Sequence, residues 1–551
     1  MSDPTDPKAP ALAGPALDRR SLLAGLAVAG AAAGVEASPA AARAAGESRA
    51  AIDDALRAKI DTVVVIYAEN RSFNNLFADF PGLAQPLAKL PPERALQRDR
   101  DGRVLDRLPR VWEGMVPDKQ VVEHTEFLIT EADLPERPNA PYALATPAGD
   151  PLPHGVITRD LIHSFYNNQL QINGGRNDGF VAWGDSGALV MGYYSDGRAN
   201  LRLWNVAREF TLCDAFFMGA FGGSFVNHQY LVAATPPFYP DADKSPAKDR
   251  VVKLDPAYSD PPRPLLRAGT KASAMDGPVR FVPDSLTPDH RAVNTMLPPY
   301  LPTYQADPDK PGMALVTSQT LPPQSHAHIG DRLDEAGVEW AWYAGGWAEA
   351  MAGRANSASF PSRPNFQPHH QPLNYFANLA PGTPARERRL RDGGLGETAR
   401  TNHFLADAKA GKLPPVTFYK PQGDLNMHAG YSDVDAGDRH ITGVIDVLRT
   451  SPQWDKMLVI ITFDENGGWW DHVAPPKGDR WGPGTRIPAL IVSPHAKKGH
   501  VDHTIYDTGS IARFLIRRFG LKTLPGLVER DKAMLAAGGP APGDLTAALV
   551  L

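Results

Sequence analysis

Two long apolar runs without alternation constrain the fold of this chain more than any other feature of its sequence. Residues 61–68 read DTVVVIYA and residues 457–463 read MLVIITF. A strand with one face in water alternates apolar and polar residues, whereas these runs are apolar on both faces, which is typical of strands inside a parallel sheet. The sequence therefore predicts two interior strands, far apart in the chain, within one sheet.

Weaker patterns extend this prediction along the chain. Further strands are expected at 210–217, 415–419 and 487–493. Helical patterns cover 325–337, 438–450 and 508–519, and Ser325 would cap the first of them. Strands that alternate with helices predict an α/β fold with an open, mostly parallel sheet and helices on both faces.

Three segments do not fit this alternation, because they are rich in proline, charge or both and show little periodicity: 80–155, 236–315 and 352–400. We interpret them as long loop insertions that form a lid or rim over the sheet. The 49 glycines and 53 prolines of the 551 residues are compatible with ordered loops and fall below the proportion typical of disorder. Residues 46–551 are therefore predicted to form a single catalytic domain with insertions.

The first 45 residues predict an export signal. Arg19 and Arg20 precede a short apolar stretch that ends near Val35, and small residues follow at 37–45. This order is typical of a twin-arginine signal, and the stretch is too short and too weakly apolar to span a membrane. An alanine-rich tail or amphipathic helix is the alternative. The signal predicts export of the folded protein to the periplasm or outside the cell, and the single cysteine, Cys213, excludes an internal disulfide.

Charge and hydropathy narrow the classes of partner. The 57 Lys and Arg against 62 Asp and Glu give a net charge of −5, and no basic run is long enough to follow a phosphodiester backbone. Nucleic acid is therefore not an expected partner. The mean hydropathy of −0.31 agrees with the expectation of no transmembrane segment. The sequence does not indicate an oligomeric state.

Acidic pairs end both apolar runs. Glu69 and Asn70 follow the first run, and Asp464 and Glu465 follow the second. Ligands of open α/β sheets bind at the carboxyl ends of the strands, so these side chains are expected to converge there. Three carboxylates and an amide oxygen in one cleft would suit a hard divalent cation. The alternative is that acidic residues merely make the loops after the strands polar.

Ser224 follows a glycine turn and begins the helix expected to reach about residue 234. Free backbone N–H groups and the helix dipole at this position favour an anion and lower the cost of an alkoxide. The same donors would hold the oxygens of a phosphoryl group in transfer, so the position suits a nucleophile. An ordinary serine cap after a glycine turn is the alternative.

Histidines supply the remaining candidates: His163, His369, His370 and His428. Protonated imidazoles donate to phosphate oxygens, and one imidazole can protonate a leaving alcohol. A lone histidine is more often a satisfied core or surface group, and that alternative stays open for each. His472, just after the second acidic pair, has no assigned role at this stage.

Seven segments together resemble the bacterial phosphoesterase family that holds the non-haemolytic phospholipases C and the AcpA-type acid phosphatases, within the alkaline-phosphatase-like superfamily. The segments are IYAENRSFNNLF (66–77), QINGGRNDGF (171–180), MGYY (191–194), FTLCDAFFMGAFGGSFVNHQYL (210–231), HAGYSD (428–433), FDENGGWWDHVAPP (463–476) and GTRIPALIVSPHAKKGHVDHTIYD (484–507). The resemblance implies one divalent metal cation bound by Glu69, Asn70, Asp464 and Glu465. It further implies that Ser224 is both a metal ligand and the nucleophile, and that the phosphoryl group is surrounded by His163, His369, His370 and His428.

One departure separates the two branches of that family. Phospholipases C typically carry Gly-Pro-Thr and then Pro-Asn-Arg at the nucleophile, whereas this chain carries Gly222-Gly223-Ser224 and then Val226-Asn227-His228. The resemblance thus favours a metal-dependent acid phosphatase that hydrolyses phosphate monoesters through a phosphoserine intermediate. The end of the chain at Leu551 favours it too, because longer phospholipases C carry extra carboxy-terminal modules.

Three alternatives to the phosphatase remain. The first is a phospholipase C or other phosphodiesterase that acts on phospholipid head groups, so that the partners are small phosphorylated substrates or phospholipid. The second is a non-catalytic phosphate-binding surface protein. The third is a sulfatase, whose Cys/Ser-x-Pro-x-Arg motif is absent at Ser224.

Overall fold

The computed structural model describes residues 39–353 and 366–551. Contacts divide the chain into Met1–Asp54 and Ala55–Leu551, and the fold below is that of the second unit. Residues 1–38 of the expected export signal, which covers 1–45, lie outside the described residues, and the helix α2 spans Pro39–Lys59. The export signal therefore stays a prediction.

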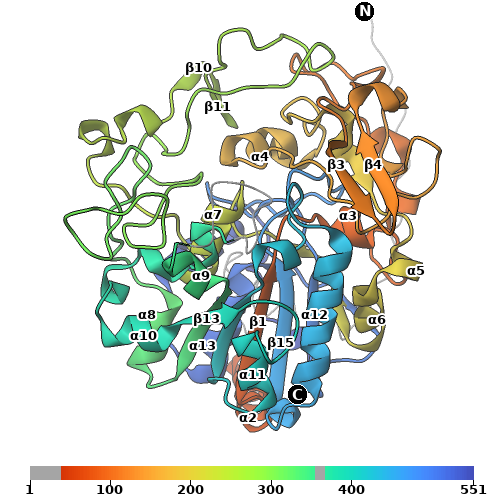
Figure 1. Cartoon of the computed structure of the whole chain (residues 1–551). Helices are drawn as coiled ribbons and strands as arrows, with labels where there is room; N and C mark the ends of the chain where they lie inside the picture. The colour runs from red at the N-terminus through yellow and green to blue at the C-terminus, as the bar shows by residue number, and fades with distance from the viewer. Residues whose placement is uncertain (1–38, 354–365) are drawn as a thin grey trace, which may run out of the picture. The chain divides into compact units, whose positions relative to one another are not determined.

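An eight-stranded sheet forms the centre of the second unit, in the order β13-β12-β14-β1-β15-β16-β8-β17 (Figure 1). The strands are β1 (Thr62–Ala68), β8 (Thr211–Cys213), β12 (Trp340–Gly345), β13 (Leu390–Gly394), β14 (Val416–Lys420), β15 (Met457–Phe463), β16 (Ala489–Val492) and β17 (His500–Asp502). Every neighbouring pair is parallel except the two pairs that involve β16. The predicted open, mostly parallel sheet is confirmed.

The two apolar runs are neighbours in the middle of this sheet. β1 pairs with β15 along its whole length, from Thr62 beside Met457 to Ala68 beside Phe463. All residues of both strands are buried, which explains why neither run alternates. Because the register is in step, both strands end at the same level.

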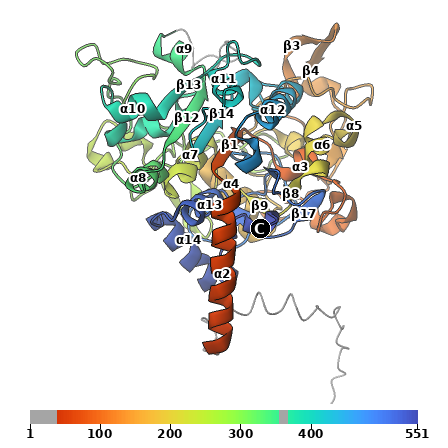
Figure 2. The same ribbon diagram turned by 90° about the horizontal axis from the view of Figure 1, so that it is seen from below.

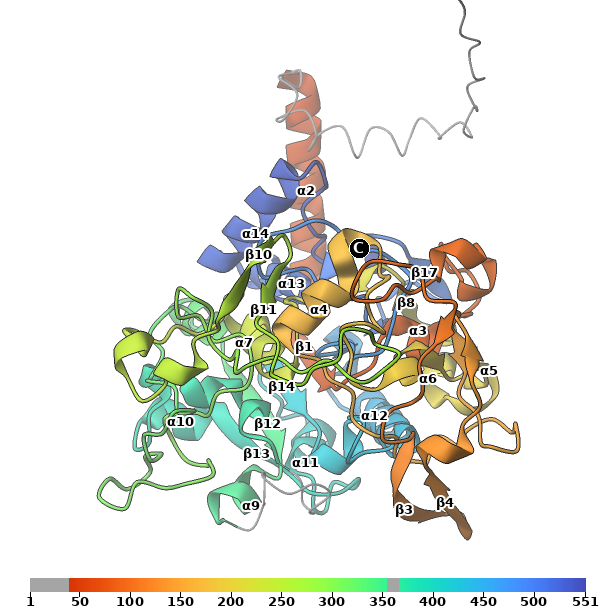
Figure 3. The ribbon, with the colours of Figure 1, turned by 90° about the horizontal axis from the view of Figure 1, so that it is seen from above.

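Helices cover both faces of the sheet. α11 (His403–Lys409) and α12 (Val434–Arg449) lie on one face, and α13 (Gly509–Phe519) lies on the other, where α7 (Ser224–Ala233) packs against it (Figures 2 and 3). α12 begins earlier than predicted because Asp433 caps it, accepting a hydrogen bond from the Ala436 N–H.

The predicted helix at 325–337 is shorter in the structure, where α8 spans Ile329–Glu335. Its cap is His328, whose ring accepts from the Asp331 N–H while the Asp331 carboxylate accepts from the His328 N–H. The prediction of Ser325 as the cap was therefore wrong. This reciprocal bond fixes the start of the helix three residues later.

Short elements fill two of the three predicted insertions, outside the central sheet. Residues 80–155 hold β2 (Arg107–Leu108) to β6 (Tyr142–Ala143), and residues 236–315 hold β10 (Leu254–Ser259) and β11 (Pro262–Pro264). Figure 1 shows β3, β4, β10 and β11 beyond one end of the central strands. Across residues 39–353 and 366–551, no helix combines the length and apolar character needed to cross a membrane.

The third segment, 352–400, is not simply an insertion. Its residues Leu390–Gly394 form β13, the edge strand of the central sheet, which pairs in parallel with β12. The sequence LRDGG has no apolar pattern because the edge strand is only half covered. The sequence prediction missed β13 for lack of such a pattern. It also missed the neighbouring β12, although its sequence WAWYAG is apolar, fully buried and flanked by glycines.

Candidate active site

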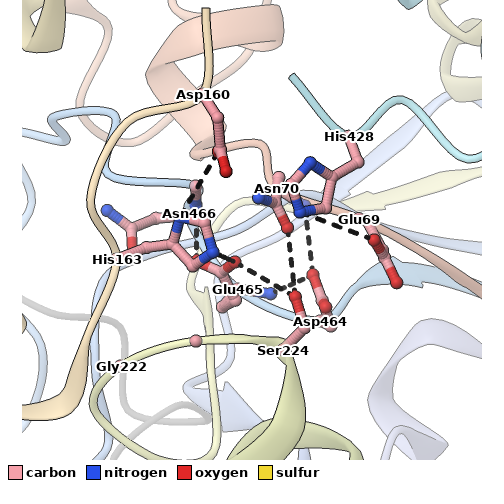
Figure 4. A network of polar contacts seen from close by, with 12 residues as sticks. Glu69, Asn70, Asp160, His163, Gly222, Ser224, His428, Asp464, Glu465 and Asn466 are labelled. Atoms are coloured by element: carbon pink, nitrogen blue, oxygen red, sulfur yellow. Dashed lines mark hydrogen bonds and ion pairs between the residues drawn. The ribbon is translucent and has the colours of Figure 1, made fainter. Parts of the chain in front are cut away.

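The ends of β1 and β15 form the floor of the site, which consists of Glu69, Asn70, Asp464 and Glu465 (Figure 4). The Asn70 N–H donates to Asp464 Oδ1 at 3.0 Å, and the Arg71 N–H donates to the Glu465 carbonyl at 3.1 Å. Asn70 has a left-handed backbone, with φ of 61°. The two loops are thereby tied to each other directly beyond the strands, as the sheet topology predicted.

Ser224 begins α7 and faces this floor. Its Oγ lies 3.2 Å from Asn70 Oδ1 and 3.5 Å from Glu465 Oε1. The turn before it requires glycine, because Gly222 has φ of 93° and a Cβ there would lie 2.6 Å from the Phe165 backbone. The close approach of these two segments brings the start of α7 to the floor.

Burial governs the charges of the floor. Together with the neighbouring Glu69 carboxylate, which contributes less, it raises the pKa of Asp464 to about 7. Burial also holds the pKa of Glu465 well above its usual range. Carboxyl groups that would otherwise bind protons are suited to a cation, which removes the repulsion between them.

The donor set fits a hard divalent cation. It comprises the Asn70 amide oxygen, the Ser224 hydroxyl and the Asp464 and Glu465 carboxylates, all of them oxygen ligands. Glu69 is not part of this set, because its carboxylate contacts other side chains.

Glu69 differs from the other three predicted ligands because both of its carboxylate oxygens contact side chains and one of them lies against a lysine. Oε1 lies 2.6 Å from Lys420 Nζ and 2.8 Å from His370 Nε2, and Oε2 accepts a hydrogen bond of 2.8 Å from the Tyr431 hydroxyl. Burial alone would raise the pKa of Glu69, but Lys420 and His370 outweigh it and hold the pKa well below its usual range. The structure therefore pairs this predicted metal ligand with a lysine.

A cavity of about 390 Å³ opens above Ser224. Three of the four predicted histidines line it, namely His163, His369 and His428. The 236–315 segment contributes to its wall through Val293, Asn294, Thr295 and Tyr304. His370 is fully buried and does not line the cavity, so the predicted direct contact with a phosphoryl group does not fit its position.

The cavity histidines differ in charge. Burial opposes protonation of His163, but the Glu465 and Asp160 carboxylates outweigh it and raise the pKa of His163 to about 9. Burial lowers the pKa of His369 and of His428, and it lowers the pKa of His370 to about 3. The expectation of several imidazoles protonated in mild acid therefore fits only His163 in this structure.

Comparison with known proteins shows the family to which this chain belongs. The model of the Phosphoesterase family matches residues 60–522, which include the whole floor, Ser224 and all four predicted histidines. The chain belongs to the phosphoesterase family. This finding confirms the resemblance seen in the sequence motifs.

Relatives of this phosphoesterase are named as phospholipases C. Phospholipase C B of Mycobacterium tuberculosis is 23% identical over 84% of this chain and 74% of its own length. Non-hemolytic phospholipase C of Pseudomonas aeruginosa is 30% identical over 27% of this chain and 25% of its own length. Non-specific phospholipase C1 of Arabidopsis thaliana is 33% identical over 23% of this chain and 30% of its own length. Such names support a phosphoric ester hydrolase.

Solved structures are similar only at a distance. A protein in the alkaline phosphatase superfamily from Vibrio parahaemolyticus matches with a TM-score of 0.29 and 11% identity, over 61% of this chain and 64% of its own. The assignment to the phosphoesterase family therefore depends on the sequence match.

Three buried residues of the site escaped the sequence analysis: Lys420, His228 and Tyr431. Lys420 is the last residue of β14, so the rule that found Glu69 at a strand end applies to it as well. His228 lies one turn after Ser224 on α7, where its Nδ1 donates to the Ser224 carbonyl at 2.8 Å. Tyr431 had no comparable signal.

His472 takes no part in the cavity wall. Its ring bonds to Asn74 Oδ1 at 2.9 Å and to the Gln85 carbonyl oxygen at 3.0 Å. These contacts tie the loop after β15 to residues 74–85. His472 thus stabilises the packing of these two segments against each other.

Proposed function

We propose that this phosphoesterase is a metal-dependent hydrolase that attacks phosphate esters with Ser224, and that its substrates are phosphodiesters of the phospholipid head-group type. The observation that carries the proposal is the position of Ser224, which begins α7 at the base of a cavity and lies within 3.5 Å of floor oxygens from two strands. A nucleophile, anion-binding backbone and a set of cation ligands meet at that point.

Asn70, Ser224, Asp464 and Glu465 would hold the divalent cation. When bound, it would neutralise the floor carboxylates and lower the pKa of the Ser224 hydroxyl. The N–H groups at the start of α7 would bind the phosphoryl oxygens, and the cationic His163 would add a charged donor. Ser224, whose hydroxyl proton would pass to water when the cation binds, would then form a bond to phosphorus as the ester bond to the leaving alcohol breaks.

The leaving alcohol needs a proton, for which His369 and His428 are the candidates on the cavity wall. A neutral imidazole gains affinity for a proton once an anionic substrate binds beside it, because the negative charge stabilises the imidazolium. The imidazole that gives its proton to the alkoxide can then accept one from the water that cleaves the phosphoserine. The two half-reactions return Ser224 and the imidazole to their starting states.

The diester preference is supported by the relatives, whose names are those of phospholipases C. Hydrolysis of phosphate monoesters is the second candidate, and Gly222-Gly223-Ser224 favours it, since the resemblance associates this form of the nucleophile turn with acid phosphatases. p-Nitrophenyl phosphorylcholine and p-nitrophenyl phosphate separate the two candidates. A kcat/KM at least about tenfold higher for the monoester would replace the diester assignment.

Replacement of the nucleophile tests the reaction itself. Ser224→Ala should lower turnover by more than about 10³-fold and abolish a covalent phosphoprotein detected by mass spectrometry after an acid quench. Ser164→Ala, on the same cavity wall, is the matched control and should keep most of the activity. Equal turnover by Ser224→Ala and the native chain would refute the proposal, as would phosphate binding by the native chain without any hydrolysis.

We also propose export through the twin-arginine pathway, on the evidence of residues 18–45. Replacement of Arg19 and Arg20 by lysine should retain the protein in the cytoplasm of a bacterial host, as measured by cell fractionation. Unchanged export of that double variant would contradict this pathway.

A further inference from the structure

Lys420 is a buried cation without an assigned role in the reaction. It is the last residue of β14, and its side chain is fully buried. Its Nζ lies 2.6 Å from Glu69 Oε1 and 5.5 Å from the centre of the Tyr67 ring. Since Lys420 does not line the cavity, it cannot touch a substrate there. An effect of Lys420 on the reaction must therefore act through its buried neighbours, of which Glu69 is the charged group in direct contact.

The carboxylate that Lys420 holds belongs to a set of potential zinc ligands. Ligand atoms of Glu69, His369 and His370 all lie within 4.8 Å of one another. His370 Nε2 is 2.8 Å and His369 Nε2 is 3.8 Å from the same Glu69 oxygen that Lys420 contacts. One carboxylate and two imidazoles are a common protein ligand set for Zn²⁺. The Lys420 ammonium group contacts Glu69 Oε1, the oxygen that would bind a Zn²⁺ ion at this position.

The charge balance of the floor agrees with this arrangement. Glu69, Asp464 and Glu465 are all fully buried, so their charges must be compensated within the protein. One divalent cation together with the Lys420 ammonium supplies three positive charges for these three carboxylates, and the cationic His163 is balanced by Asp160, 3.7 Å away. A second divalent cation beside Lys420 would face repulsion that water does not screen.

We propose that Lys420 is a positioning residue that limits the site to one divalent cation, because its ammonium group occupies the Glu69 carboxylate and blocks a second metal site at Glu69, His369 and His370. By the same contact it keeps Glu69 directed at His370 and Tyr431, beside the cavity-lining His369. This inference rests on the proposed metal-dependent function.

Removal of the ammonium group should open the second site. Lys420→Met keeps the length of the side chain and deletes its charge, so the freed Glu69 carboxylate should bind Zn²⁺ with His369 and His370. We expect the metal-free native chain to bind one Zn²⁺ in calorimetric titration, and the variant to bind two. Elemental analysis after dialysis should give the same ratio.

Three further variants locate the effect. Lys420→Arg keeps a cation and should bind one Zn²⁺. Glu69→Gln combined with Lys420→Met removes the carboxylate of the second site and should also return to one. Lys498→Met is the matched control for loss of a lysine, because the Lys498 ammonium contacts the Ser493 carbonyl and the Phe210 ring, which take no part in the site. It should bind Zn²⁺ as the native chain does.

The outcomes separate this inference from the proposed function. A native chain that binds no divalent metal overturns both. One Zn²⁺ in the native chain and one in folded Lys420→Met overturns only the role of Lys420. If Lys420→Met does not fold, the combined variant with Glu69→Gln decides. A combined variant with a cooperative thermal unfolding transition supports the Glu69–Lys420 pairing, and a combined variant without one overturns it.

Discussion

The floor and the rim of the active site differ in how their charges are held. Floor residues Glu69, Asp464 and Glu465 extend from strand ends of the central sheet and are fully buried. Rim residues come from loops and remain accessible, with side-chain exposure of 49% for Asp160 and 19% for His163. Charges on the floor are compensated by fixed partners, whereas the charge of the half-exposed Asp160 on the rim is screened largely by water.

This difference assigns separate tasks to the two regions. The register of β1 and β15 sets the geometry of the floor, so a change there alters both the metal ligands and the nucleophile. The rim can change its charges at little cost because water screens them. We therefore expect changes to the floor to alter turnover by orders of magnitude, and changes to the rim to alter affinity by small factors.

Metal removal should have a large effect on both turnover and stability. Dialysis against a chelator should lower kcat by at least about 10²-fold, because the Ser224 hydroxyl would lose the cation that lowers its pKa and the substrate would lose a positive charge that attracts it. It should also lower the unfolding temperature, since a metal that binds only the folded state stabilises it. Restoration of activity by a divalent cation is the control. Full activity in the chelated, metal-free protein would contradict the assigned task of the floor.

Replacement of the two adjacent histidines should have different effects, because His369 lines the cavity and His370 does not. His369→Gln should lower kcat about 10²- to 10⁴-fold for esters with poorly leaving alcohols, and less for p-nitrophenyl esters, whose leaving group needs no proton. His370→Gln removes a hydrogen-bonding partner of Glu69 and should cost about 1–3 kcal/mol of unfolding free energy. Similar dependence of both variants on the leaving group would contradict the distinction.

A change at the rim should be smaller. Asp160 lies at the cavity wall, and its carboxylate is 3.7 Å from His163 Nδ1. Asp160→Asn removes a negative charge near the path of an anionic substrate, so KM should fall by about two- to fivefold at low ionic strength. The difference from the native chain should disappear at about 0.5 M salt. A loss of kcat on the scale of His369→Gln would place Asp160 with the floor.

The same contrast explains what the sequence could predict. Strands β1 and β15 are covered on both faces, so their apolar runs and the acidic residues after them were recognisable. Edge strand β13 carries only a weak pattern, and the antiparallel direction of β16 depends on pairing that no local pattern encodes. Interior strands such as β1 and β15 are thus easier to predict than the edge strand β13, although the interior strand β12 was missed as well.

Site residues follow a similar division. Ser224, Glu69 and Asp464 were recognisable because each stands where an element begins or ends. Lys420 stands at such an end too, but the sequence does not show that its ammonium group turns to Glu69. The difference between His369 and His370 depends on the direction of two side chains in one short turn, which only the tertiary packing determines.

The smallest expected effect is on the free energy of unfolding, which changes with pH through carboxyl groups of the 236–315 segment. Burial raises the pKa of Asp284 to about 6, so the folded state favours the protonated carboxyl. Its ionisation therefore costs stability as pH rises above the unfolded value near 4, and the full cost is reached above about pH 6. Asp284→Asn should gain about 1–2 kcal/mol at pH 7, and the gain should vanish by about pH 4.

Asp289, on the same segment, should behave in the opposite way. Burial opposes its ionisation, but the Arg480 guanidinium outweighs burial and lowers the pKa of Asp289. Its carboxylate therefore stabilises the fold above the unfolded pKa, and this contribution is lost as pH falls through the lower, folded value. Asp289→Asn should lower the unfolding temperature at pH 7 and lose that effect in acid. Thermal unfolding of both variants between about pH 2 and pH 8 would contradict this account if their pH slopes had the same sign.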